Sequence, residues 1–139
     1  MSAGYVLLID DNPFDLELTL NAFAEAWPAE IRAVEGGQAA LELLFNPLGE
    51  LPRLILLDLN MPGVDGFTVL TQLKSNTDLR VVPVAVLSTS SEERDRARAY
   101  QLGANSYLVK PPTYEDLLVM VRRLGAYWLE HNLPAYGQP

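Results

Sequence analysis

The stretch Leu54-Ile55-Leu56-Leu57-Asp58-Leu59-Asn60-Met61-Pro62-Gly63 decides the fold of this chain. Four consecutive aliphatic residues are typical of a short strand that is buried on both faces, as in a parallel sheet. Pro62 and Gly63 then favour a turn. Asp58 is therefore expected at the point where a buried strand ends, which suggests a chemical role for its carboxylate.

A second apolar run, from Tyr5 to Ile9, also ends in acidic residues, Asp10 and Asp11. Since parallel strands end at the same edge of a sheet, these two carboxylates and that of Asp58 are predicted to meet there. Carboxylates packed together repel one another unless a cation lies between them. We interpret the three as a divalent-metal site beside a reactive aspartate. Asp10 or Asp11 taken alone could equally cap the helix that follows.

Short apolar runs alternate along the chain with longer segments of helical periodicity, which predicts an α/β fold with a doubly wound, five-stranded parallel sheet. The strands are expected at residues 5–9, 31–34, 54–57, 84–87 and 106–109. The expected helices run from Pro13, capped by Asn12, to before Pro28; from Gly36-Gly37 to before Pro47; from near Gly66; from Ser91-Glu92-Glu93 to Leu102-Gly103; and from Tyr114 to Glu130.

Length and composition limit the classes of protein to which the chain can belong. Its 139 residues fit one domain over residues 1–139, with a short C-terminal extension from about residue 131 and no output domain. The net charge of −8 disfavours binding to nucleic acid or to an anionic membrane, and the lack of cysteine excludes thiolate metal sites. No targeting or membrane-spanning segment is evident, so we expect a cytoplasmic protein.

Polar residues follow the first, third, fourth and fifth expected strands in a recognisable order: Asp10-Asp11, Asp58 with Met61-Pro62-Gly63 and Asp65-Gly66, Ser88, and Lys110-Pro111. In these residues the chain resembles a two-component response regulator receiver domain over essentially its whole length. The resemblance implies the flavodoxin-like strand order 2-1-3-4-5. It also implies that Asp58 accepts a phosphoryl group from a sensor histidine kinase.

The resemblance further implies a cofactor, Mg²⁺, for which Mn²⁺ can substitute. In the family pattern Asp11, Asp58 and the backbone carbonyl of Asn60 bind the ion directly, and Asp10 binds it through a water molecule. This arrangement suits a hard cation that takes octahedral oxygen ligands and keeps some of its waters.

By the same resemblance Lys110 and Ser88 contact the phosphoryl oxygens, and a cis peptide before Pro111 directs Lys110 into the cleft. Phosphorylation draws the Ser88 hydroxyl inward and Tyr107 moves into the vacated space. This switch changes the face made by the fourth helix, the strand at 106–109 and the last helix. Taken singly, Ser88 could instead cap a helix, Lys110 could be a surface lysine, and Tyr107 could be a half-buried strand residue.

The last helix carries more apolar side chains than one core-facing stripe can bury. Leu117, Val121, Leu124 and Trp128 would fill that stripe, whereas Leu118, Val119, Tyr127 and Leu129 lie off it. An exposed apolar surface usually marks a contact site, so we predict a homodimer through this helix. The alternative is that these are scattered surface residues without a partner.

The connection at residues 45–53 is long, and together with the C-terminal segment 127–134 it resembles single-domain receivers that are paired with phytochrome-type sensor kinases. Such a protein is not an enzyme beyond its own phosphorylation and dephosphorylation.

Two other readings remain open. A haloacid-dehalogenase-like, Mg²⁺-dependent phosphatase also has an aspartate nucleophile after a strand, but it has a second aspartate two residues later, where this chain has Asn60. A non-phosphorylated flavodoxin-like binding module would leave the three carboxylates and Lys110 unexplained.

Overall fold

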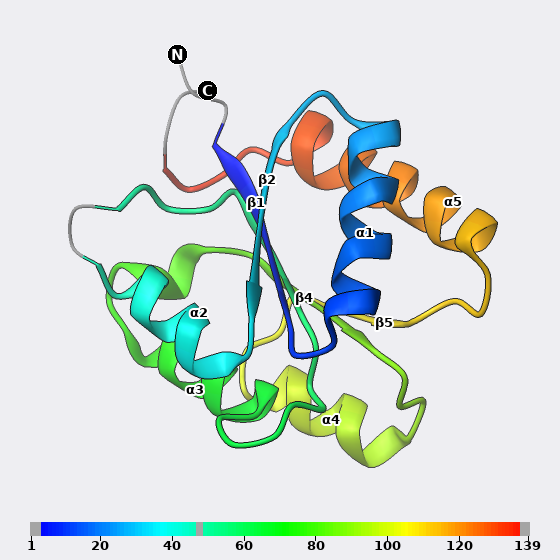
Figure 1. Cartoon of the computed structure of the whole chain (residues 1–139). Helices are drawn as coiled ribbons and strands as arrows, with labels where there is room; N and C mark the ends of the chain where they lie inside the picture. The colour runs from blue at the N-terminus through cyan, green and yellow to red at the C-terminus, as the bar shows by residue number, and fades with distance from the viewer. Residues whose placement is uncertain (1–3, 47–48, 137–139) are drawn as a thin grey trace.

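A five-stranded parallel sheet forms the centre of the computed structural model, which describes residues 4–46 and 49–136 (Figure 1). The strands are β1 (Tyr5–Asp10), β2 (Glu30–Glu35), β3 (Leu54–Leu57), β4 (Val84–Ser88) and β5 (Ser106–Val109). They lie in the order β2-β1-β3-β4-β5, and every neighbouring pair is parallel. The predicted fold class and strand order are confirmed.

Helices cover both faces of this sheet. They are α1 (Pro13–Ala26), α2 (Gly37–Leu44), α3 (Gly66–Ser75), α4 (Glu93–Gln101) and α5 (Tyr114–Gly125), with a short 3₁₀ turn η1 (Leu79–Val81) and a π-helical segment η2 (Ala126–His131). Figure 1 shows α1 and α5 on one face and α2, α3 and α4 on the other.

The two faces bury separate hydrophobic cores because successive side chains of a strand point to opposite sides. Val6 and Leu8 of β1 pack with α1 and α5, where Phe23 is fully buried. Leu7 and Ile9 pack on the other side with α2, α3 and α4. Strands buried on both faces hold their ends rigidly, and those ends carry the acidic residues.

Helix α1 begins as the sequence predicts. The side chain of Asn12 accepts hydrogen bonds from the backbone N–H groups of Phe14 and Asp15, at 3.0 and 3.2 Å. The helix ends at Ala26, before Pro28. Asn12 is therefore the cap, which leaves the carboxylates of Asp10 and Asp11 available for another role.

The end of the last helix differs from the prediction of one continuous helix to Glu130. Helix α5 ends at Gly125 and continues as the π-helical segment η2. The change coincides with a close contact: the indole N–H of Trp27 donates to the carbonyl of Val121 at 3.0 Å, and a Cβ on Gly125 would lie 2.0 Å from the indole ring. The sequence pattern gives no sign of this contact between α1 and α5.

The described part of the C-terminal extension folds back onto the segment that precedes β3. The guanidinium of Arg53 donates to the carbonyl of Asn132 at 3.3 Å, and the hydroxyl of Tyr136 donates to the carbonyl of Pro52. Parts of the predictions rest on residues 1–3, Pro47 and residues 137–139, which lie outside the described residues.

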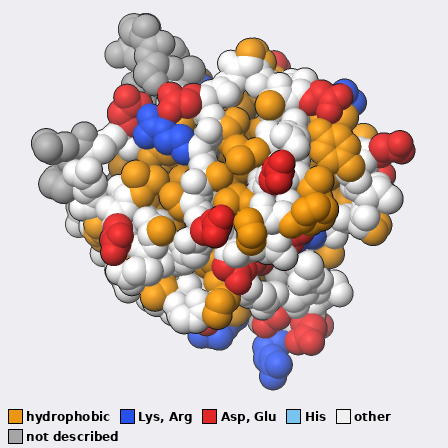
Figure 2. Space-filling view, in the orientation of Figure 1, with side chains coloured by type: hydrophobic (Ala, Val, Ile, Leu, Met, Phe, Trp, Pro, Cys, Tyr) orange, Lys and Arg blue, Asp and Glu red, His pale blue; other side chains and the backbone are white. Residues whose placement is uncertain are grey.

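Acidic side chains are spread over the face shown in Figure 2, and Lys and Arg form no continuous patch on that face. None of the helices in residues 4–46 and 49–136 combines the length and the apolar composition needed to cross a membrane.

Candidate functional site

Strands β1 and β3 bring three carboxylates together at the carboxyl edge of the sheet. Asp10 is the last residue of β1, Asp11 follows it, and Asp58 follows β3, where its backbone N–H still donates to the carbonyl of Ile9 at 2.9 Å. Oxygen atoms of the three carboxylates all lie within 4.8 Å of one another. Asp10 and Asp58 are buried. The convergence predicted from the two apolar runs is confirmed.

The turn after Asp58 depends on a glycine. A Cβ on Gly66 would lie 2.4 Å from the carbonyl oxygen of Asp58 and 2.5 Å from Cα of Leu59. The backbone N–H of Gly66 instead donates to the carbonyl of Leu59 at 3.1 Å. The backbone N–H of Asn60 donates to the Asp58 carboxylate at 3.3 Å. The start of α3 thus packs directly against the backbone that positions Asp58.

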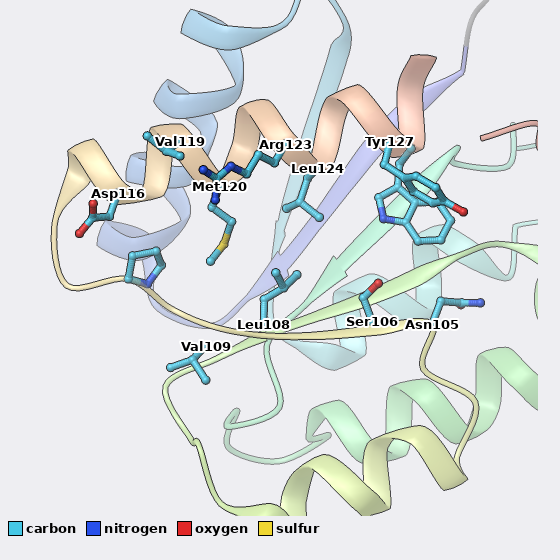
Figure 3. Close-up of a pocket in the computed structure, with 12 residues that line it drawn as sticks. Asn105, Ser106, Leu108, Val109, Asp116, Val119, Met120, Arg123, Leu124 and Tyr127 are labelled. Carbon is cyan, nitrogen blue, oxygen red and sulfur yellow. The ribbon is translucent and has the colours of Figure 1, made fainter. Parts of the chain in front are cut away.

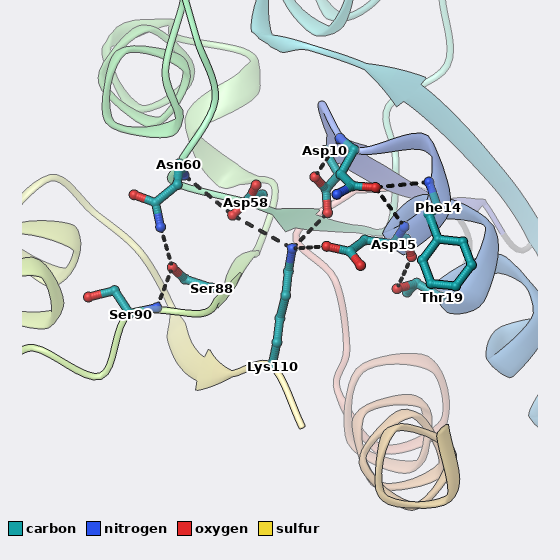
Figure 4. Close-up of polar contacts among 10 residues, drawn as sticks. Asp10, Phe14, Asp15, Thr19, Asp58, Asn60, Ser88, Ser90 and Lys110 are labelled. Atoms are coloured by element: carbon teal, nitrogen blue, oxygen red, sulfur yellow. Dashed lines mark hydrogen bonds and ion pairs between the residues drawn. The ribbon is translucent and has the colours of Figure 1, made fainter. Parts of the chain in front are cut away.

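Lys110 extends into the acidic cluster from the end of β5, as Figure 4 shows. Its Nζ lies 2.9 Å from Oδ2 of Asp10, 3.3 Å from Oδ2 of Asp15 and 3.9 Å from Oδ1 of Asp58. Burial acts against the ammonium, but its hydrogen bond to Asp10 and the charges of Asp58, Asp10 and Asp15 outweigh this effect. The pKa of Lys110 is therefore raised.

For Asp58 burial has the opposite effect, because it disfavours the charged carboxylate, and it raises the pKa of Asp58 to about 7. The charge of Lys110 lowers it and the neighbouring charge of Asp10 raises it. A single ammonium therefore does not balance the carboxylates that meet here. Three acidic side chains with converging oxygen atoms are a donor set that fits a hard divalent cation such as Mg²⁺.

Ser88, at the end of β4, closes the other side of the site. Its hydroxyl accepts a hydrogen bond from the side-chain amide of Asn60 and one from the backbone N–H of Ser90, each at 3.2 Å. The hydroxyl of Tyr107, which does not lie in the acidic cluster, donates to the carbonyl of Ser90 at 2.9 Å. Tyr107 is half-buried, which agrees with its alternative interpretation as an ordinary residue of the strand.

The expected cis peptide before Pro111 is wrong: no cis peptide occurs in the described part of the chain. The trans form of an X–Pro bond is favoured by about 0.5–1 kcal/mol. Lys110 reaches the carboxylates of Asp10 and Asp15 without the cis bond.

Two residues that the sequence did not single out belong to the site. Asp15 forms an ion pair with Lys110, and Ser90 connects Ser88 to Tyr107. An acidic residue in the first turn of a helix ordinarily indicates an interaction with the helix dipole. A serine after a strand ordinarily indicates a turn or a cap. Neither pattern predicts the observed contacts.

A comparison with known protein families identifies the family of this chain. The model described as "Response regulator receiver domain" matches residues 6–122. The chain belongs to this family. Probable methanogenesis regulatory protein FilR2 of Methanothrix harundinacea is 42% identical over 131 residues, which cover 91% of this chain and 84% of that protein. Response regulator Rcp1 of Synechocystis sp. is 39% identical over 137 residues, which cover 94% of this chain and 92% of that protein.

Solved structures of receivers superpose closely on this chain. The Mn²⁺-bound form of Rcp1 has a TM-score of 0.87 and 35% identity, over 96% of this chain and 99% of that one. The phosphorylated cyanobacterial phytochrome response regulator RcpA has a TM-score of 0.89 and 34% identity, over the same shares. A metal-bound neighbour and three converging carboxylates together identify a divalent-cation site of the receiver type, which takes Mg²⁺ or Mn²⁺.

Proposed function

We propose that this receiver accepts a phosphoryl group on Asp58 from a phosphohistidine of a sensor kinase. One observation carries the proposal: the Asp58 side chain, 7% exposed, has carboxylate oxygens of Asp10 and Asp11 within 4.8 Å and the ammonium of Lys110 at 3.9 Å. An isolated aspartate is a poor nucleophile towards phosphorus. Here Lys110, together with a cation held by the carboxylates, can neutralise the phosphoryl oxygens, which is the main task in the loose transition state of phosphoryl transfer.

In the proposed reaction an oxygen of Asp58 forms a bond to phosphorus as the bond from phosphorus to the kinase imidazole breaks. The electron pair of the broken bond stays on the imidazole nitrogen, which can then take up a proton. Lys110 pairs with the transferred oxygens as a point charge, and the hydroxyl of Ser88 donates to one of them. The product is an acyl phosphate on Asp58.

The metal ligands proposed for this chain are Asp11, Asp58 and the backbone carbonyl of Asn60, with Asp10 acting through a water molecule. When bound, the cation neutralises charge on the phosphoryl oxygens during transfer. The three acidic residues are held by the ends of β1 and β3, which are rigid because both strands are buried.

The proposed output surface consists of α4, β5 and α5. This proposal is supported by three hydrogen bonds, all of which involve Ser90. The backbone N–H of Ser90 donates to Ser88, its carbonyl accepts from Tyr107 on β5, and its hydroxyl donates to Asp95 on α4 at 2.7 Å. If Ser88 moves to the phosphoryl group, it must give up its hydrogen bond from Ser90. The change then reaches both α4 and β5.

We also propose that two copies of the chain pair through α5. A cavity of about 790 Å³ lies between β5 and α5 (Figure 3). Val119 is 40% exposed and Tyr127 is 54% exposed, so apolar surface remains open beside it. Asp116 and Arg123 also line this cavity, seven positions apart on α5. In an antiparallel, two-fold contact Asp116 would face Arg123 of the second copy, which makes the surface complementary to itself.

The kinase is proposed to be of the phytochrome type, because RcpA is a phytochrome response regulator and the chain covers 99% of its length. FilR2, a probable methanogenesis regulator, is as similar in sequence as Rcp1. Phosphotransfer profiling against purified sensor kinases would show which class of kinase phosphorylates this chain. Preferential transfer from a kinase that is not of the phytochrome type would contradict this part of the proposal.

Incubation with acetyl phosphate and Mg²⁺ tests the proposed reaction and separates it from the alternatives. We expect one phosphoryl group per chain, cleaved by hydroxylamine and lost in Asp58→Asn. Steady release of phosphate from a phosphate ester would indicate a phosphatase instead. Neither phosphoprotein nor phosphate release would indicate a binding module. Asp78→Asn, an exposed aspartate away from the acidic cluster, is the matched control and should be phosphorylated normally.

A further inference from the structure

Lys110 has a partner outside the metal-binding trio. Its Nζ lies 3.3 Å from Oδ2 of Asp15, in the first turn of α1. Among the described residues, the oxygens that group within 4.8 Å belong to Asp10, Asp11 and Asp58, and Asp15 is not one of them. Asp15 is therefore a fourth acidic residue at the site, and its carboxylate points towards the ammonium of Lys110 (Figure 4).

Two hydrogen bonds fix the backbone of Asp15 in the first turn of the helix. Its backbone N–H donates to the side chain of Asn12, and its carbonyl accepts from the hydroxyl of Thr19 at 3.0 Å. The cap of the helix is supplied by Asn12, so the Asp15 carboxylate is not needed for that purpose. Its side chain is 37% exposed, whereas that of Lys110 is 16% exposed.

We propose that Asp15 is a positioning residue that holds Lys110 on the α1 side of the site and competes with the phosphoryl group for its ammonium. The inference rests on the proposed phosphorylation of Asp58. In this structure Lys110 lies within hydrogen-bonding distance of Asp10 and Asp15, but Asp58 is 3.9 Å away. The oxygens of a phosphoryl group on Asp58 would extend towards this ammonium, and Asp15 competes with them for its three N–H donors.

Removal of the Asp15 charge should then affect the two ligands of the site in opposite directions. Lys110 is released towards Asp58 and the phosphoryl group, so a phosphoryl mimic binds more tightly. The same shift brings positive charge closer to the carboxylate trio, and one negative charge is lost, so Mg²⁺ binds more weakly. The interaction energy of a partly exposed ion pair corresponds to a change of about twofold to fivefold in each affinity.

The test compares Asp15→Asn with Glu17→Gln, an exposed position on the same helix that loses the same charge. Titration calorimetry gives the affinity for Mg²⁺ alone, and then for beryllofluoride at saturating Mg²⁺. We expect Asp15→Asn to weaken Mg²⁺ and strengthen beryllofluoride, with Glu17→Gln close to the parent in both. Equal affinities for the two variants, or weaker beryllofluoride binding in Asp15→Asn, would overturn the inference.

The measurement is repeated in a Lys110→Met background, because an effect that acts through Lys110 should disappear there. Persistence of the beryllofluoride effect in that background would also overturn the inference. Parent protein and Asp58→Asn are tested with acetyl phosphate in parallel. If the parent is not phosphorylated, the proposed function fails. If the parent is phosphorylated on Asp58 and Asp15→Asn binds both ligands as Glu17→Gln does, only the role of Asp15 fails.

Discussion

The side-chain amide of Asn60 donates a hydrogen bond to the hydroxyl of Ser88 at 3.2 Å, and so joins the turn after β3 to the end of β4. The same hydroxyl accepts from the backbone N–H of Ser90. Ser88 is fully buried. Its position is therefore defined by two donors, and a movement towards Asp58 has to break or rearrange these contacts.

The first prediction concerns Ser88→Ala. Addition of Mg²⁺ and beryllofluoride to the parent should change the amide chemical shift of Ser90, because that N–H loses its acceptor. In Ser88→Ala the shift change should be absent. Beryllofluoride should also bind about tenfold to a hundredfold more weakly, as expected for one lost hydrogen bond to a charged group. NMR titration measures both effects.

The control for this experiment is Ser91→Ala, which removes an exposed hydroxyl one residue beyond Ser90. It should behave as the parent does. An unchanged Ser90 shift response in Ser88→Ala would show that Ser88 does not connect the site to Ser90.

The second prediction follows from the raised pKa of Asp58, about 7 in the folded protein against 3.8 for the free side chain. Between these values the folded chain binds a proton that the unfolded chain has released. Its contribution to stability therefore falls as the pH rises from about 4 to about 7. In EDTA, Asp58→Asn should raise the free energy of unfolding at pH 8 by on the order of 1–3 kcal/mol.

Urea denaturation at several pH values, with EDTA or with Mg²⁺, measures this effect. The gain in Asp58→Asn should vanish near pH 4, where the carboxyl is protonated in the folded parent. It should also shrink with Mg²⁺, which neutralises the carboxylates in the parent. A gain that does not depend on pH would argue against burial of a charged Asp58 as its cause.

The third prediction concerns the turn that holds Asp58. Gly66→Ala would place a Cβ within 2.5 Å of backbone atoms of Asp58 and Leu59, so the turn must move. We expect a loss of about 1–3 kcal/mol in the free energy of unfolding and weaker Mg²⁺ binding. Gly49→Ala is the control, because the nearest atom to its added Cβ is 3.3 Å away. Denaturation and calorimetry should show a clearly smaller change in that variant than in Gly66→Ala.

The fourth prediction tests the proposed dimer. Val119→Glu adds a charge to the exposed face of α5, beside the cavity between β5 and α5. Sedimentation velocity should show a dimer for the parent and a monomer for this variant. Val81→Glu changes a residue of similar exposure on η1, outside that cavity, and should remain dimeric. A parent that is monomeric at all concentrations tested would contradict the proposed dimer.

Much of the fold follows from the chain because the three central strands, β1, β3 and β4, are buried on both faces. Leu54 to Leu57 and Tyr5 to Ile9 could not be mistaken for surface segments, and their acidic ends had to meet once the strands were parallel. Asn12 and Pro28 likewise marked the ends of α1. These features depend on residues that are close in sequence.

The sequence did not predict features that depend on contacts between distant elements. Asp15 contacts Lys110, which is 95 positions away in the sequence, and Trp27 contacts Gly125 where α5 becomes π-helical.

The prediction of a cis peptide before Pro111 came from resemblance alone, and the structure has no cis peptide in its described residues. No local pattern carries such information.

The most direct test of the central claim is a crystal structure of the protein with Mg²⁺ and beryllofluoride. We expect beryllium on the carboxylate of Asp58, the ion bound by Asp11, Asp58 and the carbonyl of Asn60, and fluorides contacted by Lys110 and Ser88. A beryllofluoride group on another residue, or a site without either ligand at saturating concentrations, would contradict it.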